Sequence, residues 1–512
     1  MSPHAFHPVM TCAEAREFER AFFAGDADGS RARGAMRLAA SGVARETRRL
    51  LEETSGDVSR LLVLCGKGRN AGDALLAAAD LLTPGAECLV CAPEGVARLS
   101  AEAARALEHL MSKSGAGVRV AESWDCEFVR RPCVILDGLT GSGFRPPLSG
   151  AMREAVLGAN RCENALRVAV DLPSGAGDKS DAPLFAAHLT VATGILKSPM
   201  LSPEARASAG RIRYADIGFF DGGAPESSVS VVSPAGLREL DAPRHAMSDK
   251  RDHGHVAVIG GHRMMPGALL LNVLGALRAG AGLVTAFCPA SVHAAFAAAA
   301  PEAMWVPMPE AEDGGLAPSG LAVALGRLAR ADALVCGSGL GASPGSLGLV
   351  SEILMRSEIP AVVDADAIRP EVLRVLPARP PGAGAVVVTP HGGEFERIAG
   401  REAGEGFSTL GAVAREFGVV VAHKGPCTRV ADGSRGVVIP YGGPALARGG
   451  SGDLLAGITG ALLARIPRPA VECAALAAAW HGAAADHVAS RRGAVALRTS
   501  ELLDGLGPCL RG

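Results

Sequence analysis

The sequence predicts an α/β protein made of two α/β/α three-layer domains, in which helices cover both faces of a parallel sheet. The candidate strands, such as 61–65 and 333–336, are continuous apolar runs rather than alternating ones, which is typical of strands buried on both faces. Gly-rich turns connect several of these strands to the next helix, as in nucleotide-binding sheets. The chain has 512 residues and 48% hydrophobic content, which is enough for more than one packed core.

The first domain is expected at residues 10–225. Its opening segment, 11–54, has a helical pattern in which Ala, Arg and Glu surround an apolar stripe. A buried strand at 61–65, a Gly-rich turn at 66–73 and a helix at 74–82 follow it. This order predicts the first strand–turn–helix unit of a nucleotide-binding sheet.

Polar residues lie at the ends of two further strands of this domain. The strand 134–137 ends at Asp137, and the strand 168–171 ends at Asp171. Because ligands bind beyond the carboxyl ends of parallel strands, we expect both to share one crevice with Asn70 and Ser174. Their oxygen atoms suit a hard cation, and Asp171 can instead serve as a proton acceptor. The alternative is that each Asp only caps a helix or a turn.

A polar, turn-rich segment at 221–228 precedes the second domain, which is expected at residues 235–510. After a charged stretch at 241–251, a new sheet begins at 255–261 and a helix of small residues follows at 267–280. Further strands are expected at 283–287, 333–336, 361–364, 385–388 and 419–422. Most of these runs do not alternate, which again favours a parallel sheet.

The most informative motif of the chain is Arg448–Asp453, at the start of an apolar helix. Glycines and a serine occupy what should be its first turn, so successive backbone N–H groups can converge on an anion. Asp453 lies in the same turn, where its carboxylate can accept a proton from a hydroxyl during phosphoryl transfer. The motif indicates phosphoryl chemistry, and the alternative is a Gly-rich turn that binds nothing.

Other polar residues of the second domain also follow strands. Lys424 and Thr428 come after the strand 419–422, where an ammonium and a hydroxyl can contact phosphate. His391 can contact substrate or cap the next helix, and Glu394 can cap the same helix. The sequence has no GxxxxGK[ST] motif, so we do not expect a P-loop nucleotide site.

Charge and hydropathy exclude several classes of protein. The formal net charge of -2 provides no basic excess for a general nucleic-acid binder. No apolar run is long enough to span a bilayer, and residues 1–4 lack a secretory pattern. We therefore expect a cytoplasmic protein with neither a nucleic acid nor a membrane as partner.

The 12 cysteines are scattered through apolar runs, as reduced core thiols would be. Cys88 and Cys91 form a CxxC, but no second CxxC or paired His motif accompanies it. His253 and His255 likewise lack partners at metal-ligand spacing. The sequence therefore favours core thiols over a transition-metal site.

Several segments of the first domain together match a known family: 66–73, 137–143, 170–175, 190–197, 210–212 and 216–218. They resemble the NAD(P)H-hydrate epimerase domain. The resemblance implies a Rossmann-like fold, interconversion of the R and S epimers of hydrated NADH and NADPH (NADHX and NADPHX), and a bound K+ ion. The implied K+ ligands are Asn70, Asp137 and Ser174, and Asp171 is the implied proton-transfer group and a substrate contact. The other implied substrate contacts are Arg69, Asn70, Ala71, Gly72, Asp73, Gly141, Ser142, Gly143, Phe144, Arg145, Pro146 and Pro147.

The second domain contains an ordered set of short motifs: Gly260-Gly261, Gly267-Ala268, 278–284, Pro301-Glu302, 339–341, 364–367, 389–391 with Glu394, 423–425 and 449–453. As a set they are similar to the NAD(P)H-hydrate dehydratase domain of the ribokinase-like superfamily. The resemblance implies a ribokinase-like fold and dehydration of the S epimer to NAD(P)H, with ADP converted to AMP and phosphate. An epimerase domain followed by this domain is the arrangement of the bifunctional NAD(P)H-hydrate repair enzymes.

The same resemblance implies site residues for the second domain. Asp453 is the implied base, taking the proton of the hydrate hydroxyl as the terminal phosphoryl group of the nucleotide is transferred. The amides of 449–452 and a metal-bound phosphate, with Mg2+ as the metal, would hold the charge. The implied nucleotide contacts are Lys424, Gly425, Pro426, Cys427, Thr428 and Gly452, and the implied hydrate contacts are Ala268, Gly341, His391 and Asp453.

Two alternative interpretations remain at this point. The second domain can be a ribokinase-like kinase that phosphorylates a vitamin or a sugar. The first domain can be a non-catalytic binding module, because its loop at 69–74 differs from the usual family loop. We also expect a homo-oligomer, and the Ala-rich segment 474–485 suits either a core helix or a subunit interface.

Overall fold

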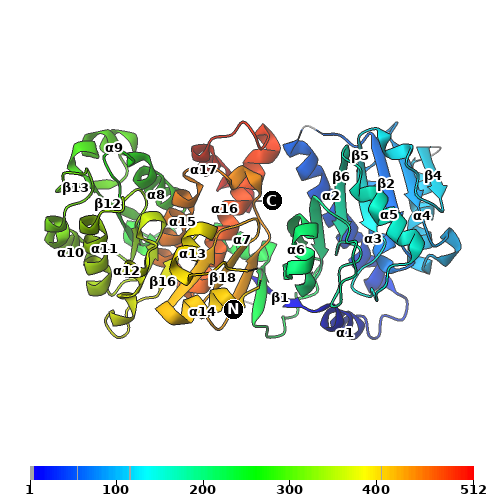
Figure 1. Ribbon diagram of the computed structural model, residues 1–512, viewed down its shortest axis with the longest axis horizontal. Coiled ribbons are helices and arrows are strands. Elements are labelled where there is room, and N and C mark those ends of the chain that lie inside the picture. The colour runs from blue at the N-terminus through cyan, green and yellow to red at the C-terminus, as the bar shows by residue number, and fades with distance from the viewer. Residues whose placement is uncertain (1–4, 55, 115–116, 405, 512) are drawn as a thin grey trace. The chain divides into compact units, whose positions relative to one another are not determined.

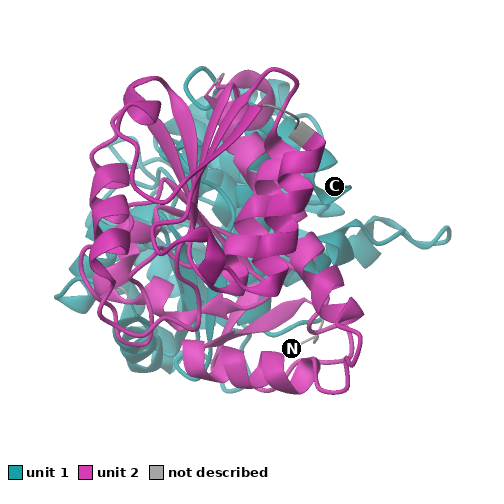
Figure 2. Cartoon of the chain, turned by 90° about the vertical axis from the view of Figure 1, so that its right-hand side faces the viewer, with its two compact units in different colours: residues 1, 235–489, 494–512 teal, residues 2–234, 490–493 magenta. Residues whose placement is uncertain are grey.

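The computed structural model describes residues 5–54, 56–114, 117–404 and 406–511. Residues 1–4, which entered the argument against a secretory segment, lie outside the described part. The chain divides into two compact units, shown in two colours in Figure 2. Residues 2–234 with 490–493 form the N-terminal unit, and residues 235–489 with 494–512 form the C-terminal unit.

The N-terminal unit is built on a seven-stranded sheet in the order β4-β3-β2-β5-β6-β7-β9. All of its ladders are parallel. The strands are β2 (Arg60–Cys65), β3 (Glu87–Cys91), β4 (Val118–Ala121), β5 (Cys133–Gly138), β6 (Ala165–Val170), β7 (Leu189–Thr193) and β9 (Arg211–Ala215). Outside this seven-stranded sheet, β1 (Phe6–Met10) pairs with β10 (Val229–Val232) and with β8 (Leu196–Lys197).

Helices cover both faces of this sheet (Figure 1). Alternate residues of β2 enter two different cores: Leu61 and Val63 pack on one face, and Leu62 and Leu64 pack on the other. This two-sided burial explains why the strand reads as a continuous apolar run. The helices of the unit are α1 (Cys12–Phe22), α2 (Ser30–Glu53), α3 (Arg69–Leu81), α4 (Ala101–Ser114), α5 (Gly150–Asn160) and α6 (Pro203–Ala209).

Two segments of this unit differ from the prediction. The helical stretch 11–54 is two helices, because a turn with left-handed Gly25 and Gly29 separates α1 from α2. The helix α3 begins at Arg69, so the second half of the predicted Gly-rich turn is helical. Ala71 therefore has ordinary helical φ and ψ angles, and its side chain is fully buried.

The C-terminal unit is built on the run of strands β13-β12-β11-β14-β15-β16-β17-β18-β19. The ladders from β13 to β17 are parallel, as predicted, whereas β17, β18 and β19 pair antiparallel. The strands are β11 (His255–Ile259), β12 (Leu283–Pro289), β13 (Met304–Met308), β14 (Ala333–Cys336), β15 (Ala361–Val363), β16 (Val386–Val388), β17 (Val419–His423), β18 (Thr428–Ala431) and β19 (Gly436–Ile439).

One face of this sheet is covered by α8 (Pro266–Arg278) and α15 (Ser451–Arg465), which lie side by side (Figure 1). Their backbones approach so closely that a Cβ atom on Gly457 would lie 2.1 Å from the Asn272 carbonyl oxygen. The small residues of both helices therefore set the position of α15. On the opposite face, α10 (Leu321–Leu328), α11 (Pro344–Arg356), α13 (Gly392–Ala399) and α14 (Ser408–Phe417) pack on one hydrophobic core.

The remaining helices of the unit are α7 (Pro234–Arg238), α9 (His293–Ala299), α12 (Pro370–Leu373), α16 (Ala470–Arg492) and α17 (Leu502–Gly505). The Ala-rich segment 474–485 lies in α16 and is buried throughout, so it is a core helix rather than an exposed face. Two α/β domains with parallel sheets and helices on both faces are thus confirmed. Every helix in the described part of the chain is too short or too polar to cross a membrane.

Candidate functional site

A pocket of about 940 Å³ lies at the carboxyl ends of the strands in the N-terminal unit. It brings together two of the predicted groups, Asn70 and Asp171, with the loop that follows β5. The other predicted substrate contacts that line it are Arg69, Asp73, Gly141, Ser142, Gly143, Phe144, Arg145 and Pro147. Ala71, Gly72 and Pro146 do not line this pocket, and Ala71 packs in the core behind α3.

Asn70, Asp137 and Ser174 are joined by hydrogen bonds through one short segment. Asn70 Nδ2 donates to the carbonyl oxygen of Thr140 at 2.6 Å, and the Thr140 amide donates to Ser174 Oγ at 3.0 Å. Ser174 Oγ in turn donates to Asp137 at 2.6 Å. Among the described residues, the buried Oδ1 atom of Asn70 has no hydrogen-bond partner.

Asp137 is a fully buried carboxyl group whose partners are neutral donors. Burial raises its pKa to about 6, against the hydrogen bonds from Ser174 and Leu139. A buried carboxylate beside an unpartnered amide oxygen is a set of hard oxygen ligands with a negative charge. These residues fit a K+ ion.

Asp171 lies just after β6 in a left-handed conformation with φ of 68°, which is rare for a residue other than Gly. Its carboxylate pairs with the ammonium of Lys197, which is 1% exposed and also donates to the carbonyl oxygen of Thr193 at 3.2 Å. Thr193 Oγ1 donates to Asp171 at 3.2 Å. Lys197 was not assigned a role from the sequence, although a lysine that ends an apolar run was an available signal.

Three further carboxyl groups line the same pocket, those of Glu19, Asp73 and Glu94. Burial raises the pKa of Asp73 well above its ordinary value, and the charge of Asp171 raises it further. Burial also raises the pKa of Glu19. The pocket therefore combines one ion-paired carboxylate with two carboxyl groups that retain protons more readily than usual.

The second candidate site surrounds the start of α15. The helix begins at Ser451, and Gly450 caps it in the left-handed region with φ of 86°. A Cβ atom on Gly450 would lie 2.4 Å from a Leu271 methyl group, so a side chain cannot fit there without movement. Asp453 lies in the first turn of the helix, as the sequence predicts.

Asp453 has an elevated pKa. Burial raises its pKa to about 6, and the neighbouring Asp364 raises it as well, whereas Ser338 and Lys424 act in the opposite direction. Asn272 of α8 donates to the Asp453 carbonyl oxygen at 2.6 Å, which ties this turn to the neighbouring helix. The carboxyl group therefore changes protonation state near neutral pH.

Lys424 links the predicted nucleotide loop to this turn. Its Nζ atom lies 2.9 Å from Asp364 and 3.8 Å from Glu394, and a Cβ atom on Gly452 would lie 3.0 Å from it. Burial alone would lower the pKa of Lys424, but Asp364 and Glu394 outweigh this effect and raise it. The ammonium therefore stays charged beside the first turn of α15.

Asp364 is the centre of this cluster, although its position at a strand end was the only feature of it that the sequence indicated. It is 1% exposed and accepts hydrogen bonds from Thr389 Oγ1 at 2.6 Å and Ser338 Oγ at 3.2 Å. Burial favours its neutral form, but Lys424, Thr389 and Ser338 lower its pKa below the ordinary value. Asp364 is therefore a buried anion that fixes Lys424.

The remaining predicted residues are distributed around this cluster. Gly341 donates its amide to Asp366 at 2.9 Å, and the Ala268 Cβ would lie 3.0 Å from a Cβ on Gly339. His391 caps α13 and forms a capping box with Glu394, as the capping alternative predicts. Gly425 and Pro426 are exposed, Thr428 begins β18, and the Cys427 thiol is buried toward Ile439.

The 12 cysteines are all free thiols, and those of the CxxC, Cys88 and Cys91, are buried in β3. Within the described ranges, no group of three or more His, Cys, Asp or Glu residues could hold a metal ion. The interpretation of core thiols holds for the ten buried cysteines, whereas Cys126 is exposed and Cys509 is half-buried.

Comparison with known proteins assigns the family. The family described as NAD(P)H-hydrate dehydratase matches residues 256–506, and the family described as YjeF-related protein N-terminus matches residues 33–198. The bifunctional NAD(P)H-hydrate repair enzyme Nnr of Moorella thermoacetica is 34% identical over 477 residues, which cover 88% of this chain and 87% of that protein. The chain belongs to the bifunctional NAD(P)H-hydrate repair enzyme family.

Other members of the bifunctional NAD(P)H-hydrate repair enzyme family are similar over the same span. The enzyme of Escherichia coli is 32% identical over 464 residues, covering 88% of this chain and 85% of that protein. The crystal structure of the ADP/ATP-dependent NAD(P)H-hydrate dehydratase from Bacillus subtilis matches 55% of this chain and 96% of that one, with 28% identity and a TM-score of 0.46. Membership of the repair family, rather than of a vitamin or sugar kinase family, confirms the resemblance drawn from the motifs.

Proposed function

We propose that this chain repairs hydrated nicotinamide dinucleotides in two steps. The N-terminal unit interconverts the R and S epimers of NADHX and NADPHX. The C-terminal unit dehydrates the S epimer to NADH or NADPH and converts ADP to AMP and phosphate. The observation that carries the proposal is the cluster of Asp453, Lys424 and Asp364 at the start of α15, in a chain of this family.

The dehydration begins with activation of the hydroxyl group on the hydrated ring, which is a poor leaving group. Asp453 accepts the hydroxyl proton while the oxygen attacks the terminal phosphoryl group of ADP, and AMP leaves. The backbone amides of 449–452 and the partial positive charge of the α15 N-terminus stabilise the negative charge on the transferred group. Lys424, fixed by Asp364, balances a further phosphate charge.

The second half of the dehydration needs no further cofactor. The phosphate is now a good leaving group, and the lone pair of the ring nitrogen displaces it as the carbon–oxygen bond breaks. Loss of a proton from the adjacent ring carbon restores the dihydropyridine. The oxygen of the original hydroxyl group leaves in the phosphate, so hydrate and ADP give NAD(P)H, AMP and phosphate.

The epimerisation uses the pocket of the N-terminal unit. Asp171 is the proposed proton-transfer group, and Lys197 holds its carboxylate in place. The pocket is also lined by cationic side chains, which suit the phosphates of a dinucleotide. These side chains are Arg16, Arg20, Lys67, Arg69 and Arg145. The 940 Å³ volume is large enough for a ligand of this size.

The metal ions of the proposal have different roles. Asn70, Asp137 and Ser174 would hold K+, which would supply a fixed positive charge beside the epimerase pocket. Mg2+ would enter with ADP, held mainly by phosphate oxygens and water, as is usual for this ion. The free thiols suit a reducing compartment, so we propose that the protein acts in the cytoplasm.

The test supplies the full-length protein with either epimer of NADHX and follows the absorbance of regenerated NADH. With ADP present, the S epimer is expected to disappear at a rate that depends on Asp453. The R epimer is then expected to disappear as well, because the N-terminal unit converts it to the S epimer. The Asp171→Asn variant should convert only the S epimer. Recovery of a stable phosphorylated product without NADH would overturn the proposed dehydration.

The same assay decides between an active and a non-catalytic N-terminal unit. If the unit only binds, the R epimer will be lost at the uncatalysed rate in both the unmodified protein and the Asp171→Asn variant. The helical conformation of Ala71 supports an active unit, because its Cβ points into the core and not into the pocket. Adding ATP in place of ADP then measures the nucleotide preference.

A further inference from the structure

The C-terminal unit has a second cavity that the proposed reaction does not use. It has a volume of about 770 Å³ and includes Arg465, the last residue of α15. Asp453 lies in the first turn of the same helix, so about 18 Å of helix separates the two positions at 1.5 Å per residue. The cavity is therefore distinct from the site around Asp453.

Two guanidinium groups converge in this cavity. Arg244 Nη2 donates to the carbonyl oxygen of Gly280 at 2.8 Å. A Cβ atom on Gly280 would lie 2.9 Å from Arg244 Nη2 and 3.8 Å from Arg465 Nε. Both side chains thus reach the same point, where their positive charges repel each other. The charge of Arg244 accordingly lowers the pKa of Arg465, in addition to the larger effect of burial.

The carboxylates that line the cavity are engaged elsewhere. Asp241 lies 3.5 Å from Arg511, and Asp252 accepts the amide of Asp249 at 2.8 Å. Within the described part of the chain, the buried Nε atom of Arg465 has no hydrogen-bond partner. Burial and Arg244 lower the pKa of Arg465, and the Cys473 thiol raises it. Neither Asp241 nor Asp252 is among the groups that shift this pKa. In the described part of the chain, neither Asp241 nor Asp252 forms an ion pair with Arg244 or Arg465, so the two guanidinium groups lack a carboxylate partner.

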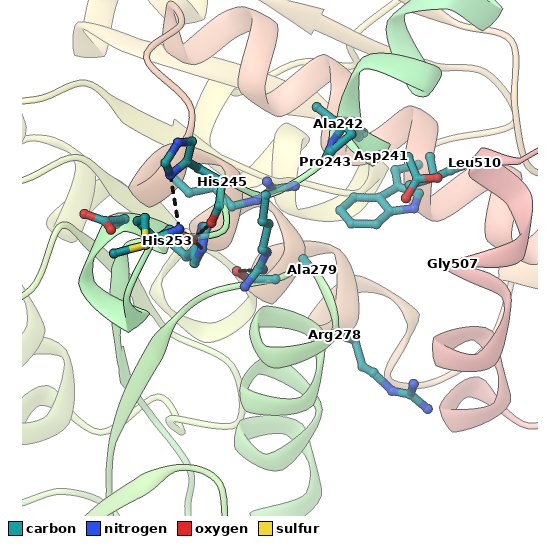
Figure 3. Close-up of a pocket in the computed structure, with 17 residues that line it drawn as sticks. Asp241, Ala242, Pro243, His245, His253, Arg278, Ala279, Gly507 and Leu510 are labelled. Carbon is teal, nitrogen blue, oxygen red and sulfur yellow. Dashed lines mark hydrogen bonds between the residues drawn. The ribbon is translucent and has the colours of Figure 1, made fainter.

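A third arginine on the cavity wall serves as a contrast. Arg278 pairs with Asp504 at 3.0 Å on an exposed surface. Figure 3 shows its side chain pointing away from His245 and His253. Arg278 therefore contributes nothing to the charge between the other two arginines, and it provides a matched control.

The rest of the lining is suited to an organic group. Trp480 is 4% exposed, and its indole nitrogen is satisfied by the Leu506 carbonyl oxygen at 2.7 Å, so its ring serves as an apolar wall. The Nδ1 atom of His245 accepts the amide of Met247 at 3.2 Å, which leaves the proton on Nε2 as a donor. A cationic pair, an imidazole donor and an aromatic wall thus line one cavity.

We propose that this cavity binds a phosphate-bearing organic anion, with its phosphate between Arg244 and Arg465. Guanidinium groups bind phosphate oxygens in pairs, and an anion placed there removes their mutual repulsion. The volume lies within the range of pockets for small organic ligands. The organic part of the ligand lies toward Trp480.

The test measures binding of phosphate-bearing probes to the full-length protein by equilibrium dialysis. The probes are inorganic phosphate, ribose 5-phosphate and AMP, because they share the anion and differ in the organic part. The unmodified protein is expected to bind one more phosphate group per chain than Arg244→Gln or Arg465→Gln, and each substitution should weaken that site at least about tenfold. Arg278→Gln should bind as the unmodified protein does.

The probes also show whether the site prefers an organic phosphate to inorganic phosphate. Tighter binding of AMP than of inorganic phosphate at the arginine-dependent site identifies an organic ligand against Trp480. Equal binding of all three probes contradicts the organic part of the proposal. Equal stoichiometry in all variants, or equal loss in Arg278→Gln, overturns the site itself.

A stability measurement distinguishes binding from a structural role of these arginines. Without ligand, Arg465→Gln is expected to unfold at the same temperature as the unmodified protein or a higher one, because it removes like-charge repulsion. With excess AMP, the unmodified protein should gain stability that the variant does not gain. A variant that is less stable in both conditions assigns Arg465 a purely structural role and contradicts the proposal. Its NADHX dehydration rate, which does not depend on this cavity, reports that the fold is intact.

Discussion

The ammonium of Lys424 lies 2.9 Å from the carboxylate of Asp364, which is 1% exposed. Neither charge is tolerated alone at this depth, because the burial that surrounds them disfavours each charged form. Asp364 holds the Nζ atom of Lys424 in place. Gly452 of α15 leaves space for the same atom, because a Cβ atom on Gly452 would lie 3.0 Å from it. The structural role of Lys424 and its proposed contact with ADP can therefore be separated by mutation.

Lys424→Met is expected to unfold the C-terminal unit more easily, by about 3 kcal/mol, because Asp364 becomes a buried anion without its cation. The double variant Lys424→Met/Asp364→Asn should recover most of that stability, since the buried charge is removed. Both variants should keep a KM for ADP at least about tenfold above that of the unmodified protein. Denaturant unfolding and ADP-dependent kinetics measure the two effects, and recovery of ADP affinity in the double variant would reduce Lys424 to a structural role.

The rate of dehydration should fall as the pH drops through about 6, the raised pKa of Asp453. The carboxylate is the form that accepts a proton, so activity is present above this pKa and is lost below it. A kcat/KM profile against pH measures the effect. The epimerase reaction, assayed at the same pH values, shows whether activity is lost because the protein unfolds. A kcat/KM for dehydration that falls only near pH 4 would contradict the role of Asp453 as the base.

Asp453→Asn should abolish dehydration and make the C-terminal unit more stable at pH 8. The pKa of Asp453 rises from 3.8 to about 6 on folding, so the ionised form destabilises the fold above pH 6, and the penalty is absent below about pH 4. The rise in pKa limits the gain at pH 8 to about 3 kcal/mol, and the weaker hydrogen bond from Ser338 to the Asn amide oxygen reduces it. Thermal unfolding at pH 8 and pH 4 tests the sign. Near-normal turnover of the variant would remove Asp453 as the base.

Two adjacent glycines should respond differently to a methyl group. Gly450→Ala is expected to destabilise the unit, because φ is 86° and the Cβ would lie 2.4 Å from Leu271. Gly449→Ala meets nothing within 4 Å and should leave the melting temperature almost unchanged. A large fall in turnover for Gly449→Ala would therefore report the approach of the phosphoryl group to this amide. Full activity of that variant would place the phosphate elsewhere.

Potassium should stabilise the N-terminal unit and stimulate epimerisation through Asn70. Asn70→Leu removes the unpartnered Oδ1 atom, so the K+-dependent rise in melting temperature should disappear in that variant. Asn160→Leu is a suitable control, since that amide bonds to Ala186 and Leu184 away from the pocket. A K+ response that survives in Asn70→Leu would contradict the ion site.

The sequence predicted strands and strand ends well because two-sided burial leaves a clear signal. Leu61–Cys65 and Ala333–Cys336 are apolar throughout, and both are central strands in the structure. The antiparallel pair β18 and β19 was not predicted. Short apolar strands that follow a run of parallel strands have no sequence pattern that marks them as antiparallel. The turn between α1 and α2 was also not predicted, although Gly25, Asp26, Asp28 and Gly29 form a cluster of turn residues that could have indicated it.

Among the site residues, those near the motif Arg448–Asp453 were the easiest to place from the sequence. Asp453 lies in the first turn of an apolar helix and beside Lys424, as the order of motifs suggests. Asp364 and Lys197 were not assigned roles, because their importance comes from partners that are 60 and 26 residues away in the chain. Lys197 at the end of an apolar run was the one available signal, but an ion pair between distant segments leaves no local pattern that identifies the two partners.

The close backbone contact between α8 and α15 has a consequence for how this site can change. Gly457 and Gly275 leave no volume for a larger residue, since their Cβ atoms would lie 2.1 Å from Asn272 O and 2.6 Å from Leu454 O. Gradual repositioning of Asp453 by substitution along this seam is therefore blocked, because each step would first break the packing. The packing of the two helices thus fixes the position of Asp453, and the loops around the start of α15 are the part of the site that substitution can change without breaking this contact.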